Sequence, residues 1–180
     1  GWNEDPAAVL EFYNMRRQDL MVVQPNHAHH LLAELEKWHD VSIITQNIDN
    51  LHERAGSTNV LHLHGEISKV TSSVDRDNPN CIQQLPLDVP LRMGDKAADG
   101  SQSVSIVRKA DVFIVIGTSL TVEPAASLIR FAPPQAQKYI INPNLSFNPY
   151  DEYIADEFEY IQQNATIGME TLIDKLQELK

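Results

Sequence analysis

Three short apolar runs, at residues 41–45, 112–116 and 139–141, place the strongest constraint on how this chain can fold. They lack the strict alternation of apolar and polar residues that marks a half-exposed strand, which indicates parallel strands buried on both faces. Segments with helical spacing lie around them, as the crossover connections of a parallel sheet require. The sequence therefore predicts an α/β fold built on a mostly parallel sheet.

Helix signals accompany these strands. Asp5 is placed to cap a first helix that has Pro6 at its first position and runs to about residue 20. Asn26 is placed to cap a second helix, with Ala28, Leu31, Leu35 and Trp38 at helical spacing. A third helix is expected to begin at Pro124 and to end before Pro133. A C-terminal helix carries one apolar stripe, formed by Met169, Leu172, Ile173, Leu176 and Leu179.

Polar residues follow each predicted strand at once. The largely polar segments are Gln46, Asn47, Ile48 and Asp49 after the first strand, Gly117, Thr118 and Ser119 after the second, and Asn142, Pro143 and Asn144 after the third. Open parallel sheets bind ligands beyond the carboxyl ends of their strands, so these exits are expected to converge on one crevice. Glycine permits close approach to a phosphate, and amide or carboxylate side chains can hold ribose hydroxyls. The pattern indicates a nucleotide site, although each motif alone is a weak signal.

Four segments, in chain order, resemble the motifs of the sirtuin family. They are residues 25–36, residues 45–52 (TQNIDNLH), residues 61–65 (LHLHG), and residues 117–120 (GTSL) followed by 124–126 (PAA). The resemblance covers nearly the whole chain. It implies a Rossmann-like, mostly parallel sheet at about residues 20–70 and 103–180, with a small appended module at about 71–102, all within one sirtuin-type domain of residues 1–180.

The resemblance also implies an activity, that of an NAD-dependent protein-lysine deacylase acting on acyl-lysine protein segments. His64 would be the catalytic base, a role that suits an imidazole near neutral pH. NAD would be bound by Gln46, Asn47, Ile48, Asp49, Gly117, Thr118, Ser119, Asn142, Pro143, Asn144 and Ala165. The products would be nicotinamide, free lysine and an O-acyl-ADP-ribose. His52 and His62 are interpreted as structural.

An acyl-group preference is suggested by Tyr13 and Arg16, which share a face of the first predicted helix. A phenol beside a guanidinium can hold a carboxylate. The pair resembles that of a sirtuin class that removes succinyl and malonyl groups, and acetyl removal is expected to persist. The alternative is an ordinary amphipathic helix with an exposed arginine. Arg17 falls on another face and is expected to be solvated.

Two other functions fit the same resemblance. One is an NAD glycohydrolase or ADP-ribosyltransferase, for which an acyl-carboxylate clamp at Tyr13 and Arg16 has no use. The other is a catalytically inactive remnant that binds nucleotide without releasing nicotinamide.

The sequence departs from the sirtuin pattern in three places. The glycine-rich loop that wraps the NAD phosphates and the substrate-binding stretch expected between Gln102 and Ser103 are not found, and both are expected in the gene product. Many sirtuins bind a structural zinc with four cysteines, whereas Cys81 is the one cysteine here, so no metal is expected. The small module would then be held by apolar packing through Ile82, Leu85, Leu87 and Leu91.

Composition limits the partners. The net charge of −11 argues against binding to duplex DNA and is compatible with lysine-rich protein segments. The apolar runs fall far short of the roughly 20 residues that span a bilayer, so no membrane partner is expected. No signal peptide is visible, and the single cysteine suits a reducing compartment, which predicts a cytoplasmic protein.

Overall fold

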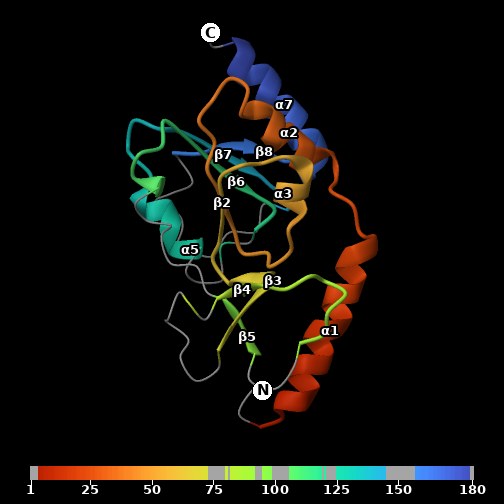
Figure 1. Ribbon diagram of the computed structural model, residues 1–180. Helices are drawn as coiled ribbons and strands as arrows, with labels where there is room; N and C mark the ends of the chain where they lie inside the picture. Colours follow the sequence, from red (N-terminus) through yellow and green to blue (C-terminus); the bar gives the residue numbers. More distant parts are fainter. Residues whose placement is uncertain are drawn as a thin grey trace.

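The computed structural model describes residues 4–72, 80, 82–91, 95–98, 106–118, 120, 125–144 and 157–178 (Figure 1). Its helices and strands follow in the order α1 (Pro6–Val22), α2 (His27–Leu35), β1 (Ile43–Thr45), α3 (Leu51–Ala55), β2 (Val60–His62), β3 (Glu66–Ser72), β4 (Gln83–Gln84), β5 (Asp95–Ala98), β6 (Val112–Ile116), α5 (Ala125–Leu128), the 3-10 helix η2 (Ile129–Phe131), β7 (Gln137–Ile141), β8 (Glu159–Ile161) and α7 (Ala165–Glu178).

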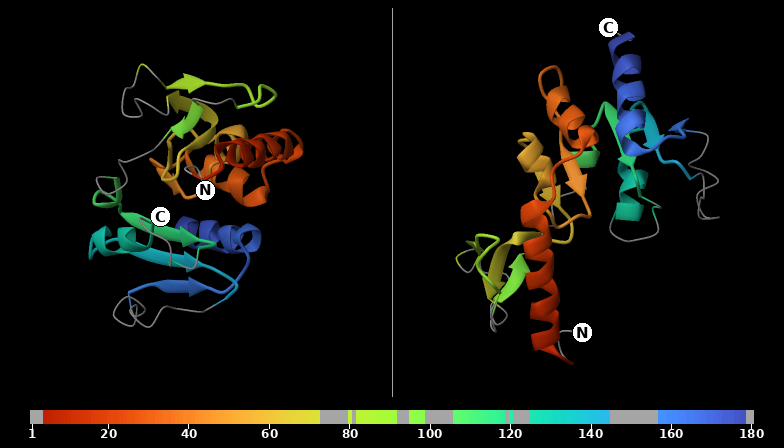
Figure 2. Two further views of the ribbon diagram at one scale, coloured as in Figure 1. Left: turned by 90° about the horizontal axis from the view of Figure 1, so that it is seen from below. Right: turned by 90° about the vertical axis from the view of Figure 1, so that its right-hand side faces the viewer.

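The parallel strands confirm the α/β class predicted from the apolar runs. Strand β1 pairs in parallel with β2, and β6, β7 and β8 form a second parallel sheet in that order. Within the described residues the parallel strands thus form two sheets rather than one. Strands β6–β8 lie toward one end of the molecule, and the small antiparallel sheet with α1 lies toward the other (Figures 1 and 2).

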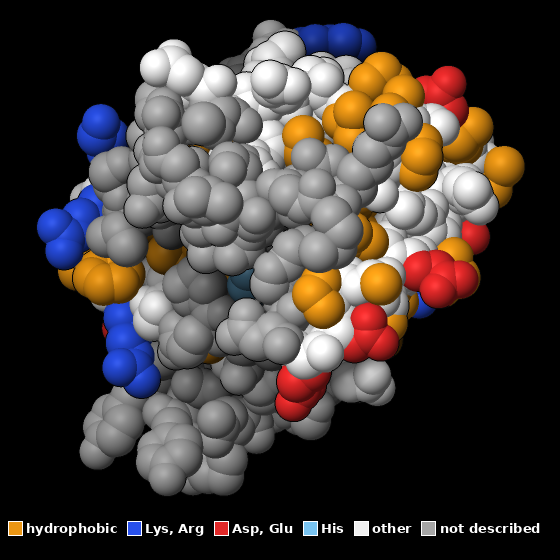
Figure 3. All heavy atoms as spheres, turned by 60° about the horizontal axis from the view of Figure 1, so that its bottom comes forward, with side chains coloured by type: hydrophobic (Ala, Val, Ile, Leu, Met, Phe, Trp, Pro, Cys, Tyr) orange, Lys and Arg blue, Asp and Glu red, His pale blue; other side chains and the backbone are white. Residues whose placement is uncertain are grey.

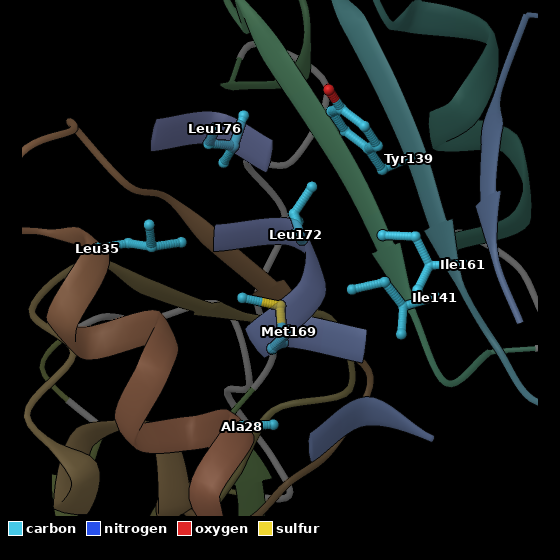
Figure 4. Packing of buried hydrophobic residues seen from close by; sticks show 8 residues of the cluster. All are labelled: Ala28, Leu35, Tyr139, Ile141, Ile161, Met169, Leu172 and Leu176. Atoms are coloured by element: carbon cyan, nitrogen blue, oxygen red, sulfur yellow. The ribbon is translucent and has the colours of Figure 1, made fainter. Parts of the chain in front are cut away.

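The main core lies where α7 and α2 cover the sheet of β7 and β8. Its buried members are Ala28, Leu35, Tyr139, Ile141, Ile161, Met169, Leu172 and Leu176 (Figure 4). Met169 and Leu172 are completely buried, as the predicted apolar stripe requires, whereas Leu179 lies outside the described residues. A side chain at Gly168 would overlap the Cγ2 methyl of Ile141, so glycine allows α7 to lie directly on β7.

Both predicted helix caps are present. The Asp5 side chain accepts a hydrogen bond of 3.0 Å from the backbone N–H of Ala8, and the Asn26 side chain accepts one of 3.2 Å from that of His29. The prediction that Trp38 belongs to the apolar stripe of α2 is wrong. The helix ends at Leu35 and a turn follows, in which the N–H of Trp38 bonds to the oxygen of Leu35, so that Trp38 is 49% exposed.

The small module is an antiparallel sheet in the order β4–β3–β5. It begins at Glu66, earlier than the boundary near residue 71 suggested by the sequence. The expected packing through Ile82 is wrong, because this side chain is 41% exposed. Leu85, Leu87 and Leu91 are half-buried, and Cys81 lies outside the described residues. Apolar packing by these leucines is therefore only part of what holds the module.

Helix α1 fastens the module through polar side chains. Arg17 is completely buried and donates hydrogen bonds to four backbone oxygens, those of Ile67, Leu85, Pro86 and Val89. The expectation that Arg17 is solvated is wrong. It lies about 100° around the helix from Arg16, on the side that faces the module. One turn earlier, Asn14 accepts a bond of 2.6 Å from the backbone N–H of Leu91.

The structure contains, within its described residues, no helix long and apolar enough to cross a lipid bilayer.

The contrast between Arg17 and Arg16 yields a matched test of stability. Arg17→Ala is expected to lower the free energy of unfolding by about 3 kcal/mol, because buried carbonyl oxygens lose a charged donor. Arg16→Ala is expected to change it by less than about 0.5 kcal/mol, since that side chain is 58% exposed. Urea unfolding measures both values. Equal losses of stability for the two variants would contradict the conclusion that Arg17 holds the small module to α1.

Candidate functional site

The loop after β1 is held in a tight conformation by its own side chains. The Thr45 hydroxyl accepts a hydrogen bond of 3.0 Å from the N–H of Asn47, and the Asp49 carboxylate accepts one of 3.0 Å from the N–H of Leu51, the first residue of α3. The oxygen of Ile48 accepts from the N–H of Ile67, which joins the loop to β3. The residues 46–49 are therefore fixed between two strands and a helix.

His64 lies beside this loop, on the turn between β2 and β3. The register places His62 opposite Thr45, and the N–H of Leu63 donates to the oxygen of Thr45 over 2.8 Å. Gly65 then turns the chain with a φ of 83°, a left-handed conformation that favours glycine. The side chain of His64 is exposed, so it is accessible to a substrate at the carboxyl end of β2.

The exits of all three predicted strands meet. The Thr118 hydroxyl donates to the side-chain oxygen of Gln46 over 3.3 Å, and the Asn142 amide donates to the backbone oxygen of Thr118 over 3.1 Å. These bonds connect the loops after β1, β6 and β7. Gly117 has a φ of 62°, and a Cβ placed on it would have no atom within 4 Å. The backbone is therefore open to close approach by a ligand at that point.

The turn after β7 is shaped by Asn142. Its side-chain oxygen accepts from the N–H of Asn144 over 3.0 Å, and the oxygen of Pro143 accepts from the Gln162 side chain over 3.4 Å. Ala165 is the first residue of α7, which begins directly after Asn164. Ser119, also expected at this site, lies outside the described residues.

Tyr13 and Arg16 lie on α1, which runs beside the small sheet (Figure 1). Arg16 contacts its own helix: its guanidinium is 3.4 Å from the Asp19 carboxylate and 5.2 Å from the centre of the Phe12 ring. The Tyr13 ring meets the same Phe12 ring edge to face. Figure 3 shows hydrophobic side chains gathered with acidic ones on the α1 side of the face it presents.

His62 contacts the loop through one of its ring nitrogens and helix α3 through the other. Its ring is buried, with Nδ1 2.7 Å from the backbone oxygen of Asn47 and Nε2 2.8 Å from the Glu53 carboxylate. Burial acts to lower the pKa of His62, but these two hydrogen bonds and the charges of Glu53 and Glu66 raise it above the ordinary histidine value. No pattern in the sequence links His62 to Glu53, which belongs to another element.

A second histidine near the loop has the opposite shift. The His52 ring lies 4.7 Å from the His29 ring, and burial, with a further contribution from His29, lowers the pKa of His52. The Nδ1 atom of His52 and the Oδ1 atom of Asn50 are buried and have no hydrogen-bond partner within the described residues. Both residues lie within three positions of the end of the loop 46–49, so these polar atoms lie near it.

Comparisons with known proteins agree on one family. The model of the Sir2 family matches residues 2–84. An NAD-dependent protein deacylase of Bacteroides thetaiotaomicron is 45% identical over 190 residues, covering 96% of this chain and 80% of the relative. One from Helicobacter pylori strain 26695 is 42% identical, covering 99% of this chain and 82% of the relative.

Solved structures give the same result. A Sir2 homologue in complex with NAD superposes with a TM-score of 0.77 at 30% identity, covering 99% of this chain and 75% of that one. A Sir2 complex with a p53 peptide and NAD superposes with a TM-score of 0.68 at 26% identity, covering 88% of this chain and 73% of that one.

The lowered pKa of His52 predicts acid sensitivity. The unfolded chain binds a proton at this histidine more readily than the folded chain, so stability is lost as the pH falls below about 6.5. His52→Gln is expected to flatten the dependence of the free energy of unfolding on pH in that range. Urea unfolding at a series of pH values measures how steeply the free energy of unfolding changes with pH. The stability of the variant above about pH 6.5, where His52 is neutral in both states, reports any loss of packing separately. An unchanged slope would contradict the prediction.

Proposed function

The chain belongs to the Sir2 family, and on that premise we propose that it is an NAD-dependent protein-lysine deacylase. One observation carries the proposal: the linked exits of β1, β6 and β7 lie next to an exposed histidine, His64, which no described hydrogen bond occupies. A binding region for the nucleotide and a base for the acyl transfer are thereby brought to the same edge of the structure.

The residues at the strand exits fit NAD as the co-substrate. Amide, hydroxyl and carboxylate groups converge there, and Gly117 leaves room for close approach. Among the described residues, buried polar atoms of Asn50 and His52 have no hydrogen-bond partner. The residues proposed to hold NAD are Gln46, Asn47, Ile48, Asp49, Gly117, Thr118, Ser119, Asn142, Pro143, Asn144 and Ala165. When bound, NAD supplies a nicotinamide that can be displaced and a ribose that accepts the acyl group.

His64 supplies the base in this proposal. Its exposed imidazole can accept the proton of a ribose hydroxyl, which makes that oxygen nucleophilic toward the acyl carbon. The turn at Gly65 and the bond from Leu63 to Thr45 hold the histidine next to the loop 46–49. The imidazole can then return this proton to the group that leaves, because near neutral pH it both accepts and donates protons.

The proposed partners are acyl-lysine segments of proteins. The net charge of −11 favours segments rich in lysine, and it disfavours nucleic acid. With one cysteine in the sequence, the chain cannot form an internal disulfide, which is compatible with a cytoplasmic location.

The proposed role of His64 predicts a large loss of activity. His64→Ala is expected to lower the rate of NAD-dependent lysine deacylation by about 10²–10⁴-fold, because a general base is removed. Nicotinamide release and peptide mass measure the rate for the full-length protein. His39→Ala replaces another exposed histidine, beyond the end of α2, and is the matched control, expected to retain the parent rate.

Three outcomes would contradict the deacylase proposal. Full activity of His64→Ala would show that His64 is not the base of the reaction. Nicotinamide release without any acyl peptide would favour an NAD glycohydrolase. Binding of NAD with no reaction in the parent protein would favour an inactive nucleotide-binding remnant.

We further propose that Tyr13 and Arg16 select acidic acyl groups, so that the enzyme removes succinyl and malonyl groups as well as acetyl. The two side chains stand three residues apart on α1, one turn of the helix. The contact between Arg16 and Asp19 is long and exposed, so Arg16 can leave it at little cost to bind a carboxylate with two parallel hydrogen bonds.

This selectivity predicts a change in preference rather than a general loss. Arg16→Met is expected to lower kcat/KM for a succinyl-lysine peptide by about 10- to 100-fold, the effect of losing a charged hydrogen-bond partner. The kcat/KM for the matching acetyl-lysine peptide is expected to stay near the parent value. Tyr13→Phe should shift preference in the same direction. Equal losses on both peptides would contradict a carboxylate-binding role.

A further inference from the structure

Both ring nitrogens of His62 face oxygen acceptors. His62 ends β2, only 4% of its surface is exposed, and it precedes His64 by two residues. Its Nδ1 atom lies 2.7 Å from the backbone oxygen of Asn47, which can only accept a hydrogen bond. Its Nε2 atom lies 2.8 Å from an oxygen of the Glu53 carboxylate. The ring therefore connects the loop 46–49 to helix α3.

A neutral imidazole cannot satisfy both contacts. It carries one N–H, so either Asn47 or Glu53 would face a lone pair instead of a donor. A proton on Glu53 would restore one contact, but the pKa of Glu53 is lowered: burial acts to raise it, and the hydrogen bond from His62 with the charges around it outweighs burial. The geometry is satisfied by an imidazolium that donates to both oxygens, in a charge-assisted bond on the Glu53 side.

The charges that face His62 come from two elements. Helix α3 contributes Glu53. Its His52 has a pKa lowered by burial and so adds little positive charge near neutral pH, and its Arg54 directs its guanidinium to the Leu20 oxygen and the Gln24 side chain. Strand β3 contributes Glu66, whose carboxylate is paired with Lys69 at 2.5 Å. A ring nitrogen of His62 and one carboxylate oxygen each of Glu53 and Glu66 lie within 4.8 Å of one another. The charges of Glu53 and Glu66 both favour the protonated form of the ring.

We propose that His62, as a buried imidazolium, is the positioning residue that clamps the backbone of Asn47 to Glu53 and so holds the loop 46–49 in its nucleotide-binding conformation beside His64. This inference deepens the proposed function and rests on it. Loss of the proton removes one of the two contacts and loosens the loop. The clamp is therefore complete below the raised pKa of His62 and is lost as the pH rises through it.

The clamp predicts how NAD affinity depends on pH. In the parent protein, the dissociation constant for NAD, measured by titration calorimetry, should be constant below the raised pKa of His62 and rise as the pH passes through it. In Glu53→Gln the rise should begin at lower pH, because the amide stabilises the imidazolium less than a carboxylate does. His62→Gln should weaken NAD binding by about tenfold at every pH, since one charged hydrogen bond is lost.

Two further measurements keep the test specific. Glu36→Gln breaks comparable carboxylate contacts, those of Glu36 to the N–H and hydroxyl of Thr58, and should leave the NAD titration unchanged. Nitrogen chemical shifts of the histidine rings, measured by NMR without nucleotide, should show that both nitrogens of His62 keep their protons to a pH above about 6.5, the ordinary histidine pKa. If the NAD affinity of Glu53→Gln recovers when the pH is lowered, the variant has lost the proton of His62. General damage to the fold would not be reversed by acid.

The outcomes separate this inference from the proposed function. No NAD binding by the parent protein would overturn the proposed function, and the NMR result would still decide the protonation of His62. Binding by the parent that is insensitive to Glu53→Gln and His62→Gln would overturn the clamp alone. A zinc titration that displaces the Nε2 proton at a stoichiometric site of Glu53, His62 and Glu66 would also overturn it, because a metal ligand must present a lone pair.

Discussion

The hydrogen bond from the Thr118 hydroxyl to Gln46 spans 3.3 Å and joins the exits of two separate parallel sheets. Each sheet alone presents polar loops at its carboxyl end. The bond, continued by Asn142 to the backbone of Thr118, places these loops in one network. A ligand that contacts both loops therefore needs little further ordering of the chain, and binding loses less energy to conformational entropy.

Local signals in the sequence were sufficient for the elements that support this network. Asp5 and Asn26 cap their helices as predicted, because a cap depends only on residues within one helical turn. The runs at 112–116 and 139–141 form β6 and most of β7, because a strand buried on both faces leaves an unbroken apolar segment. The convergence of their exits follows from the parallel direction of the strands.

Residues whose environment depends on distant partners could not be predicted. Arg17 and Arg16 are neighbours in one helix, yet the first is buried against carbonyl oxygens 50 or more positions away and the second is exposed. Trp38 continues the helical spacing of α2, but the helix ends before it. Ile82 is apolar but exposed, and polar bonds from α1 hold the segment that follows it. For Arg17, tertiary contacts outweigh the local pattern.

The histidines at positions 52, 62 and 64 show how environment assigns different chemistry to one residue type. Burial, with a contribution from His29, lowers the pKa of His52 and outweighs the charges of Glu53 and Asp49, so its ring is neutral near pH 7. Burial acts to lower the pKa of His62, but the hydrogen bonds to the Glu53 carboxylate and the Asn47 carbonyl oxygen outweigh it and raise the pKa. His64 is exposed at the strand exit. A base must offer a lone pair, and an imidazolium that donates from both nitrogens has none. His62 and His64 therefore cannot exchange roles, although two positions separate them: the first is suited to hold the loop, and the second to accept a proton beside it.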